Sequence, residues 1–229
     1  MLTVVIATEN DEERLAFTLA ALVPAAAEGC VREVIVVDAG STDATSAIAD
    51  ATGCVFIEAK GPVGERLRRG AEAATRGEWL LFLPPGAILE ARWEAEAGAF
   101  VERAARSGRA DACAAVFSYG LDDMGLLARL KEVWVATATS VTGLPHPAQG
   151  LLISRGFYRR IGGFRPLAAL EDVDIYRRIG RFRIVRLRAR ATGGADRWPS
   201  HAASRTRRAV SRLLAACRVP PRYLVRLHG

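Results

Sequence analysis

The chain has 229 residues, of which 50% are hydrophobic, enough apolar material for one domain-sized core. It is basic, with a formal net charge of +7, but it lacks zinc-finger spacing and an aromatic RNA-binding motif, so we expect no nucleic-acid partner. No apolar run approaches the roughly 20 residues that cross a bilayer, and no basic leader precedes the first predicted strand, so neither a membrane span nor a signal peptide is expected.

The charge is unevenly distributed along the chain. The first sixty residues are acidic, whereas the region after Phe157 is rich in arginine. This asymmetry indicates an anionic partner near the C-terminal half. The four cysteines, Cys30, Cys54, Cys113 and Cys217, are far apart and lack metal-ligand spacing, so we expect reduced thiols in a cytoplasmic protein and no zinc site.

Strands alternate with helices along the chain. We predict strands at 2–7, 33–38, 54–58, 79–83, 112–118, 150–153 and 182–187. We predict helices at 11–28, 43–52, 63–76, 91–107, 124–139, 155–161, 171–180 and 203–217. This order predicts an α/β domain over 1–190 with a mostly parallel sheet covered by helices on both faces. A loop at 192–200 would lead into a basic C-terminal extension, 191–229, that packs on the domain.

The first predicted strand ends on polar residues. Thr3-Val-Val-Ile-Ala-Thr-Glu-Asn10 is a short apolar run, and Asn10 stands where a helix N-cap is expected. Glu13 follows three residues later, which is the spacing of a capping box. The pattern predicts a strand followed at once by a helix.

The second predicted strand ends on a carboxylate. Residues 33–37 form a run that continues into Asp38, turns through Gly40, and offers Ser41 or Thr42 as a helix N-cap. Ligands bind open α/β sheets beyond the carboxyl ends of the strands, so this turn could hold a nucleotide. An ordinary capped strand-to-helix turn explains the same residues.

Together these segments resemble the nucleotide-binding half of family 2 glycosyltransferases, which have the GT-A (Rossmann-like) fold. The resemblance covers roughly residues 2–190. It continues in the ordered motifs Gly77-Glu-Trp-Leu-Leu-Phe-Leu83, Gln149-Gly-Leu-Leu-Ile-Ser154, Gly162-Gly-Phe164 and Glu171-Asp-Val-Asp174.

The resemblance implies a site for the donor, a nucleoside-diphosphate sugar. The Asp38 position would recognise the base, and a basic residue in Gly64-Glu-Arg-Leu-Arg-Arg-Gly70, best matched by Arg66, would reach the nucleotide. Arg68 and Arg69 are equally consistent with solvated helix charges. The implied donor-binding residues are Ala7, Thr8, Glu9, Asp38, Arg66 and Gly86.

The resemblance also implies the catalytic group. In the Glu-Asp motif the second carboxylate, Asp172, would be the base that takes a proton from the acceptor hydroxyl, and Glu171 would support it or the acceptor. Acidic residues also favour the first turn of a helix because of the macrodipole, which is the structural alternative. On the acceptor side we place Gln149 and His146, although Ala148 stands where related sequences often have an acid, and a loop histidine without a role also fits.

The metal site is where the sequence departs from the family pattern. An Asp-x-Asp motif is expected after the strand that ends at Leu83, but the chain has Pro84, Pro85 and Gly86 there. Hard cations need oxygen ligands, usually carboxylates. We therefore expect no protein metal site, and manganese or magnesium only together with bound nucleotide.

The resemblance implies an inverting hexosyltransferase with an unknown acceptor. A catalytically degenerate nucleotide- or glycan-binding protein of the same fold is the alternative. A nucleotidyltransferase is a third option, which the lack of a glycine-rich phosphate loop disfavours.

The expected C-terminal helix combines basic and apolar residues. Arg205, Arg207, Arg208 and Arg212 share a segment with Val210 and Leu213. We expect the apolar stripe to pack on the domain. We expect a bacterial cytoplasmic protein. The arginines could still contact an anionic membrane surface, which leaves open a peripheral position at the inner membrane.

Overall fold

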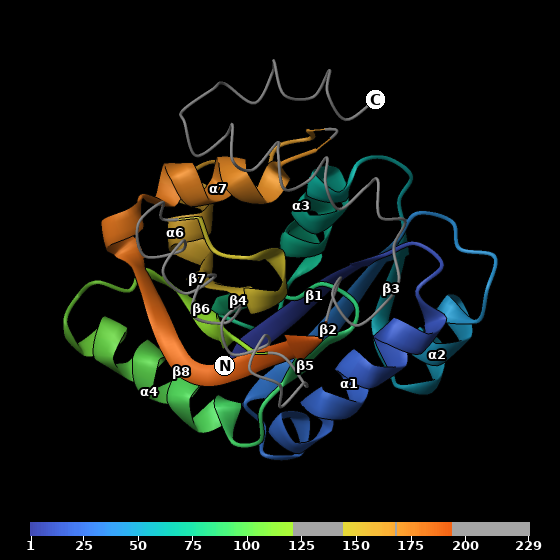
Figure 1. Cartoon of the computed structure of the whole chain (residues 1–229), viewed down its shortest axis with the longest axis horizontal. Helices are drawn as coiled ribbons and strands as arrows, with labels where there is room; N and C mark the ends of the chain where they lie inside the picture. The colour runs from blue at the N-terminus through green and yellow to red at the C-terminus, as the bar shows by residue number, and fades with distance from the viewer. Residues whose placement is uncertain (121–143, 168, 194–229) are drawn as a thin grey trace, which may run out of the picture.

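One eight-stranded sheet organises the computed structural model, which describes residues 1–120, 144–167 and 169–193 (Figure 1). The strand order is β3-β2-β1-β4-β7-β6-β8-β5. The strands are β1 (Leu2–Thr8), β2 (Val31–Asp38), β3 (Val55–Glu58), β4 (Trp79–Phe82), β5 (Ala87–Leu89), β6 (Ala114–Tyr119), β7 (Leu151–Ser154) and β8 (Ile184–Gly193). The helices are α1 (Glu12–Ala27), α2 (Thr45–Ala51), α3 (Val63–Ala73), α4 (Trp93–Arg106), α6 (Arg155–Arg160) and α7 (Glu171–Ile179), with short 3₁₀ turns η1 (Pro147–Gln149) and η2 (Arg181–Arg183).

The sheet is mixed but mostly parallel. Strands β3, β2, β1 and β4 pair in parallel, and β6 pairs in parallel with β8. Strand β7 runs antiparallel to both β4 and β6, and β5 runs antiparallel to β8. The predicted α/β class with a mostly parallel sheet is confirmed.

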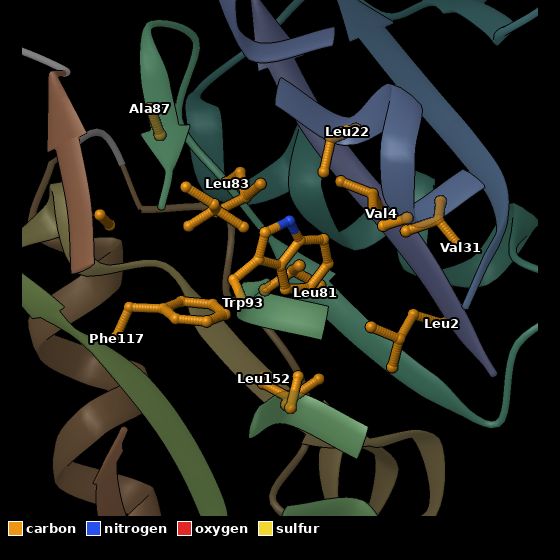
Figure 2. Packing of buried hydrophobic residues seen from close by; sticks show 14 of the residues in the cluster. Leu2, Val4, Leu22, Val31, Leu81, Leu83, Ala87, Trp93, Phe117 and Leu152 are labelled. Carbon is orange, nitrogen blue, oxygen red and sulfur yellow. The ribbon is translucent and has the colours of Figure 1, made fainter. Parts of the chain in front are cut away.

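Two hydrophobic cores cover the two faces of this sheet. Helices α1, α2 and α4 pack on one face and α3, α6 and α7 on the other (Figure 1). Adjacent residues of β2 alternate between the cores, because Val36 belongs to the first and Ile35 and Val37 to the second. Figure 2 shows Trp93 of α4 in the first core, beside Phe117 of β6, with which it makes an edge-to-face contact at 5.8 Å between ring centroids.

Most predicted elements lie within two or three residues of the observed ones. Strand β5 was not predicted, and the strand expected at 182–187 begins at Ile184 and continues to Gly193. The loop expected at 192–200 therefore begins after the first residues of that range, because β8 continues to Gly193. The helices expected at 124–139 and 203–217 lie outside the described residues.

The helix starts differ from the predicted caps. The N-cap of α1 is Asp11, and that helix start has no side-chain capping bond, so the capping box of Asn10 and Glu13 is wrong. Asn10 has φ of 51° and bonds across to the loop after β2 instead. The N-cap of α2 is Ala44, not Ser41 or Thr42. Within the described residues, no helix is long and apolar enough to cross a membrane.

Candidate functional site at the carboxyl ends of the strands

The ends of β1 and β2 meet as the sequence predicts. Thr8 and Asp38 are register partners in adjacent parallel strands. Both are buried, and the Thr8 hydroxyl donates a hydrogen bond of 2.8 Å to Asp38 Oδ1. Ala7 pairs with Val37, the residue before Asp38, and Glu9 follows Thr8 directly beyond the strand.

Asp38 uses both carboxylate oxygens to hold the turn that follows it. Oδ2 accepts from the amides of Gly40 and Ser41, at 2.8 and 2.6 Å, and Oδ1 accepts from the Ser41 hydroxyl as well as from Thr8. Burial alone would raise the pKa of Asp38, but these hydrogen bonds, led by those of Ser41, bring the pKa below its usual value. Asp38 therefore fixes the shape of the site as an ionised carboxylate.

The loops after β1 and β2 lock together through reciprocal hydrogen bonds. Asn10 Oδ1 accepts from the Thr42 amide at 2.9 Å, and the Asn10 amide donates to the Ser41 hydroxyl at 2.7 Å. Glu12 and Asp43 repeat the exchange, because the Glu12 amide donates to Asp43 Oδ2 and Glu12 Oε2 accepts from the Ala44 amide. The two loops form one preorganised rim at this edge of the sheet.

Helix α3 brings Arg66 to the same edge. A Cβ atom on Gly70 would lie 2.4 Å from Val5 Cγ1, so glycine lets the helix lie directly on β1. Arg66 lies one turn earlier on the same face of α3, and its side chain is buried, with 3% exposed. Its Nη1 donates a hydrogen bond of 2.7 Å to the Thr8 carbonyl. Nη2 lies 3.6 Å from the exposed Glu9 carboxylate, whereas Nε has no hydrogen-bond partner among the described residues.

The first turn of α3 also touches the region that precedes and begins α7. A Cβ atom on Gly64 would lie 2.2 Å from the Arg165 carbonyl oxygen and 3.1 Å from Glu171 Cβ. Only glycine fits that approach. Since Arg66 lies two residues further along α3, this helix links the Thr8–Asp38 edge to the acidic start of α7.

The three acids of α7 are not equivalent. Asp174 is 8% exposed and forms ion pairs with Arg178 and Arg165, so it holds the helix in place. Arg178 also donates to the Ile161 carbonyl, which ties α7 to the end of α6. Asp172 is half-buried, and its Oδ1 accepts from the Val173 amide at 2.8 Å. The spacing of four residues between Asp174 and Arg178 is a known ion-pair signal in helices, and it is the feature of the sequence from which this pair could have been predicted.

The Gly162-Gly-Phe164 motif packs against Tyr158 of α6. A Cβ atom on Gly163 would lie 2.9 Å from the Tyr158 ring, and Gly163 has φ of 58°. The Tyr158 hydroxyl accepts a hydrogen bond of 3.0 Å from the Phe164 amide. Burial raises the pKa of Tyr158 to about 12, so it stays neutral and structural.

Gln149 and His146 close the turn η1. Gln149 is buried, donates from Nε2 to the Phe117 carbonyl at 2.7 Å, and accepts from the His146 amide at 2.6 Å. His146 Nδ1 accepts from the Ala148 amide, and its ring lies 4.8 Å from that of Tyr119. These contacts give both residues a structural part in placing β7.

The segment after β4 offers no carboxylate to a cation. Gly86 is buried with φ of 86°, and its amide donates to the Arg14 carbonyl and to the Thr18 hydroxyl of α1. Over the described ranges, no three His, Cys, Asp or Glu side chains gather as a metal-binding group. Asp122 and Asp123, which the sequence offers as other carboxylates that could hold a metal, lie outside those ranges. The described residues therefore do not fit a cation held by the protein alone.

Comparisons with known proteins agree with this architecture. Residues 3–83 match the model of Glycosyl transferase family 2. Glucosyl-3-phosphoglycerate synthase from Mycobacterium tuberculosis, solved with Mn²⁺, uridine diphosphate and glucosyl-3-phosphoglycerate, is 20% identical with a TM-score of 0.63, over 96% of this chain and 81% of that one.

Two further solved structures show the same fold. A mycobacterial protein is 21% identical with a TM-score of 0.64, over 96% of this chain and 75% of that one. The TarS fragment 1–349 from S. aureus is 16% identical with a TM-score of 0.57, over 83% of this chain and 57% of that one. No match was found among curated protein sequences. Over residues 3–83 the chain thus matches glycosyl transferase family 2, and its fold is that of the GT-A glycosyltransferases.

Proposed function

We propose that the protein transfers a sugar from a nucleoside-diphosphate sugar to an acceptor hydroxyl, with the donor nucleotide bound beyond the ends of β1 and β2. The observation that carries this proposal is Arg66. A buried guanidinium with an unused N–H is costly unless a ligand oxygen completes it. A nucleotide supplies such oxygens, and the synthase with the same fold binds uridine diphosphate.

In the proposed reaction the acceptor oxygen attacks the anomeric carbon directly. The new bond to the sugar forms as the bond from that carbon to the diphosphate breaks, which inverts the configuration. Asp172 takes the proton of the acceptor hydroxyl, and Glu171 beside it orients the acceptor. Asp174 is committed to its arginines, and we assign this work to the two acids that the family resemblance points to, Asp172 and Glu171.

The departing diphosphate needs positive charge. The described residues after β4 supply none, so Arg66 carries more of this role, and a divalent cation joins only with the nucleotide. We keep Gln149 and His146 as acceptor-side residues that act by shaping the turn before β7. The acceptor is open, and phosphoglyceric acid is a rational first trial because the synthase of similar fold binds it.

A nucleotide-binding protein without catalysis is the second candidate. It is favoured by Pro84-Pro85-Gly86, which brings no charge to the position where a cation would assist the leaving group. The first proposal includes a cytoplasmic location, because nucleotide sugars are made in the cytoplasm.

Calorimetry with uridine diphosphate, guanosine diphosphate and the matching sugar nucleotides tests the donor site. Arg66→Met should weaken nucleotide binding by at least about tenfold, since a charge-assisted hydrogen bond contributes about 1.5–3 kcal/mol. Arg69→Met, on the exposed side of the same helix, should bind as the wild type does. Tight wild-type binding without release of nucleoside diphosphate from any sugar nucleotide and acceptor would support the second candidate.

A further inference from the structure

The turn η2 and the beginning of β8 form an exposed basic and apolar surface. Its members are Arg181, Phe182, Arg183, Val185 and Arg186, and we call it the Arg–Phe surface. Phe182 is 83% exposed and Val185 41%, which is unusual for apolar side chains beside a large core. Leu187, which follows these residues in β8, is buried in the first core and holds the strand against the domain, whereas the side chains of the Arg–Phe surface are exposed to solvent.

The surface carries positive charge without acidic residues in its own segment. From Ile175 to Gly193 the sequence has no aspartate or glutamate. Two acids do contact β8, but further along the strand, where Glu96 accepts from the amides of Arg188 and Ala189 and Glu90 accepts from that of Arg190. The turn and the start of the strand thus bring three exposed arginines, Arg181, Arg183 and Arg186, close together in sequence.

We propose that the Arg–Phe surface docks on a bilayer that contains anionic phospholipid. Arginine heads bind lipid phosphates, while an exposed aromatic ring enters the headgroup layer. The Arg181 guanidinium lies 4.5 Å over the centroid of the Phe182 ring, so one side-chain pair presents both a charge and an apolar face. Val185 adds an exposed aliphatic side chain, which a headgroup layer accepts but on which no base stacks, so a bilayer fits better than a nucleic acid.

This surface is separate from the proposed donor site. Strand β8 is parallel to β6, which reaches β1 through the antiparallel β7 and then β4, so β8 begins at the strand ends opposite Thr8. In Figure 1 β8 begins at the left, whereas β3 and α2 lie at the right. Docking therefore leaves the Thr8–Asp38 edge open, so vesicle binding and nucleotide binding test the two proposals independently.

Vesicle co-sedimentation of the full chain tests the docking. Vesicles of phosphatidylcholine with about 30% anionic phosphatidylglycerol are compared with vesicles of pure phosphatidylcholine. We expect the first to bind the wild type and the second to bind it at least about tenfold more weakly. Arg181→Glu with Arg183→Glu should weaken binding to anionic vesicles at least about tenfold. Arg32→Glu with Arg76→Glu changes the net charge equally at exposed sites elsewhere and should have a much smaller effect.

Two substitutions of Phe182 separate docking from simple charge attraction. Phe182→Ser should weaken vesicle binding about fivefold, and Phe182→Trp should preserve or strengthen it. Equal binding of both variants, or equal losses in the two arginine pairs, would overturn the proposal. So would binding of single-stranded RNA that is lost with Arg181→Glu and Arg183→Glu while anionic vesicles are ignored. Unchanged midpoints of urea unfolding in all variants verify their folding.

Discussion

The rim formed by the loops after β1 and β2 contrasts with the segment that follows β4. In the rim, acids are numerous and already engaged: Asp38 accepts four hydrogen bonds, and Glu12 and Asp43 tie the two loops together. After β4, Pro84 and Pro85 lack both charge and amide protons, and the Gly86 amide faces α1.

This contrast indicates how the chain can hold a nucleotide. The rim is rigid before any ligand arrives, so little ordering cost opposes binding. The segment after β4 brings no charge toward the diphosphate. The affinity for nucleotide is therefore expected to depend on Arg66 and the rim rather than on a cation.

The largest expected effect is on transfer itself. Asp172→Asn removes the proposed base without changing the size of the side chain, and it should slow sugar transfer about 10²–10⁴-fold. Nucleotide binding should stay within about twofold, because Asp172 belongs to α7 and not to the rim. Release of uridine diphosphate from its sugar nucleotide measures the rate, and the exposed Asp50→Asn is the control. Equal turnover in wild type and Asp172→Asn would remove Asp172 from the mechanism.

Two glycine-to-alanine substitutions, one in α3 and one in α4, test whether α3 must lie directly on β1. Gly70→Ala places a Cβ atom 2.4 Å from Val5, and the resulting overpacking should lower the free energy of unfolding by about 2 kcal/mol, net of the better helix propensity of alanine. Arg66 should shift with the helix, so nucleotide binding should weaken as well. Gly98→Ala in α4 meets no atom within 4 Å and should stabilise by up to about 1 kcal/mol. Denaturant unfolding of both variants gives the comparison, and similar changes in the two would mean that α3 has room to move.

The sequence predicted the strands and helices of the binding end well, because its signals are local. The apolar runs of β1 and β2 and the polar residues that end them placed Thr8 and Asp38 beside each other, as the strand register confirms. The N-caps were wrong because Asn10 and Ser41 bond to the opposite loop, a choice that depends on the pairing of β1 with β2.

Long-range packing explains what the sequence could not predict. Strand β5 has three residues and exists because β8 returns beside it, so Ala87 pairs with Gly193 across the chain. The saturation of Asp38 by Ser41, and the ion pairs that exclude Asp174 as a base, likewise require coordinates. The roles of Asp172, Glu171 and the donor-binding residues stay predictions.

The pH dependence of stability tests the first of the two regions. Because the pKa of Asp38 is lowered in the folded state, its contribution to stability is fully present above the unfolded value of about 3.9 and is lost as the pH falls toward the folded value. Asp38→Asn replaces one carboxylate oxygen with an NH₂ group that would face the N–H and O–H donors of the turn. It should lower the free energy of unfolding by about 1–2 kcal/mol at neutral pH. The difference from the wild type should shrink below about pH 4. Urea unfolding at several pH values measures it, and a constant difference from pH 7 to pH 3 would argue that Asp38 is not held as a carboxylate.

The smallest expected effect concerns the second region. Gly86→Asp would place an acid where the family pattern has one, yet Gly86 is buried with φ of 86°, a conformation that costs L-residues about 1–2 kcal/mol, less for aspartate. We expect a loss of about 1 kcal/mol in stability and, with uridine diphosphate present, a gain in manganese affinity of less than about tenfold, since one carboxylate cannot replace a full ligand set. Calorimetry of manganese binding with and without the nucleotide measures the gain, and Pro84→Asp, at a half-buried position of the same segment, tests whether a different point on it does better. Tight manganese binding by the wild type without nucleotide would show that acids elsewhere, such as Asp122 and Asp123, form a site, and that the contrast between the rim and the segment after β4 does not describe the metal chemistry.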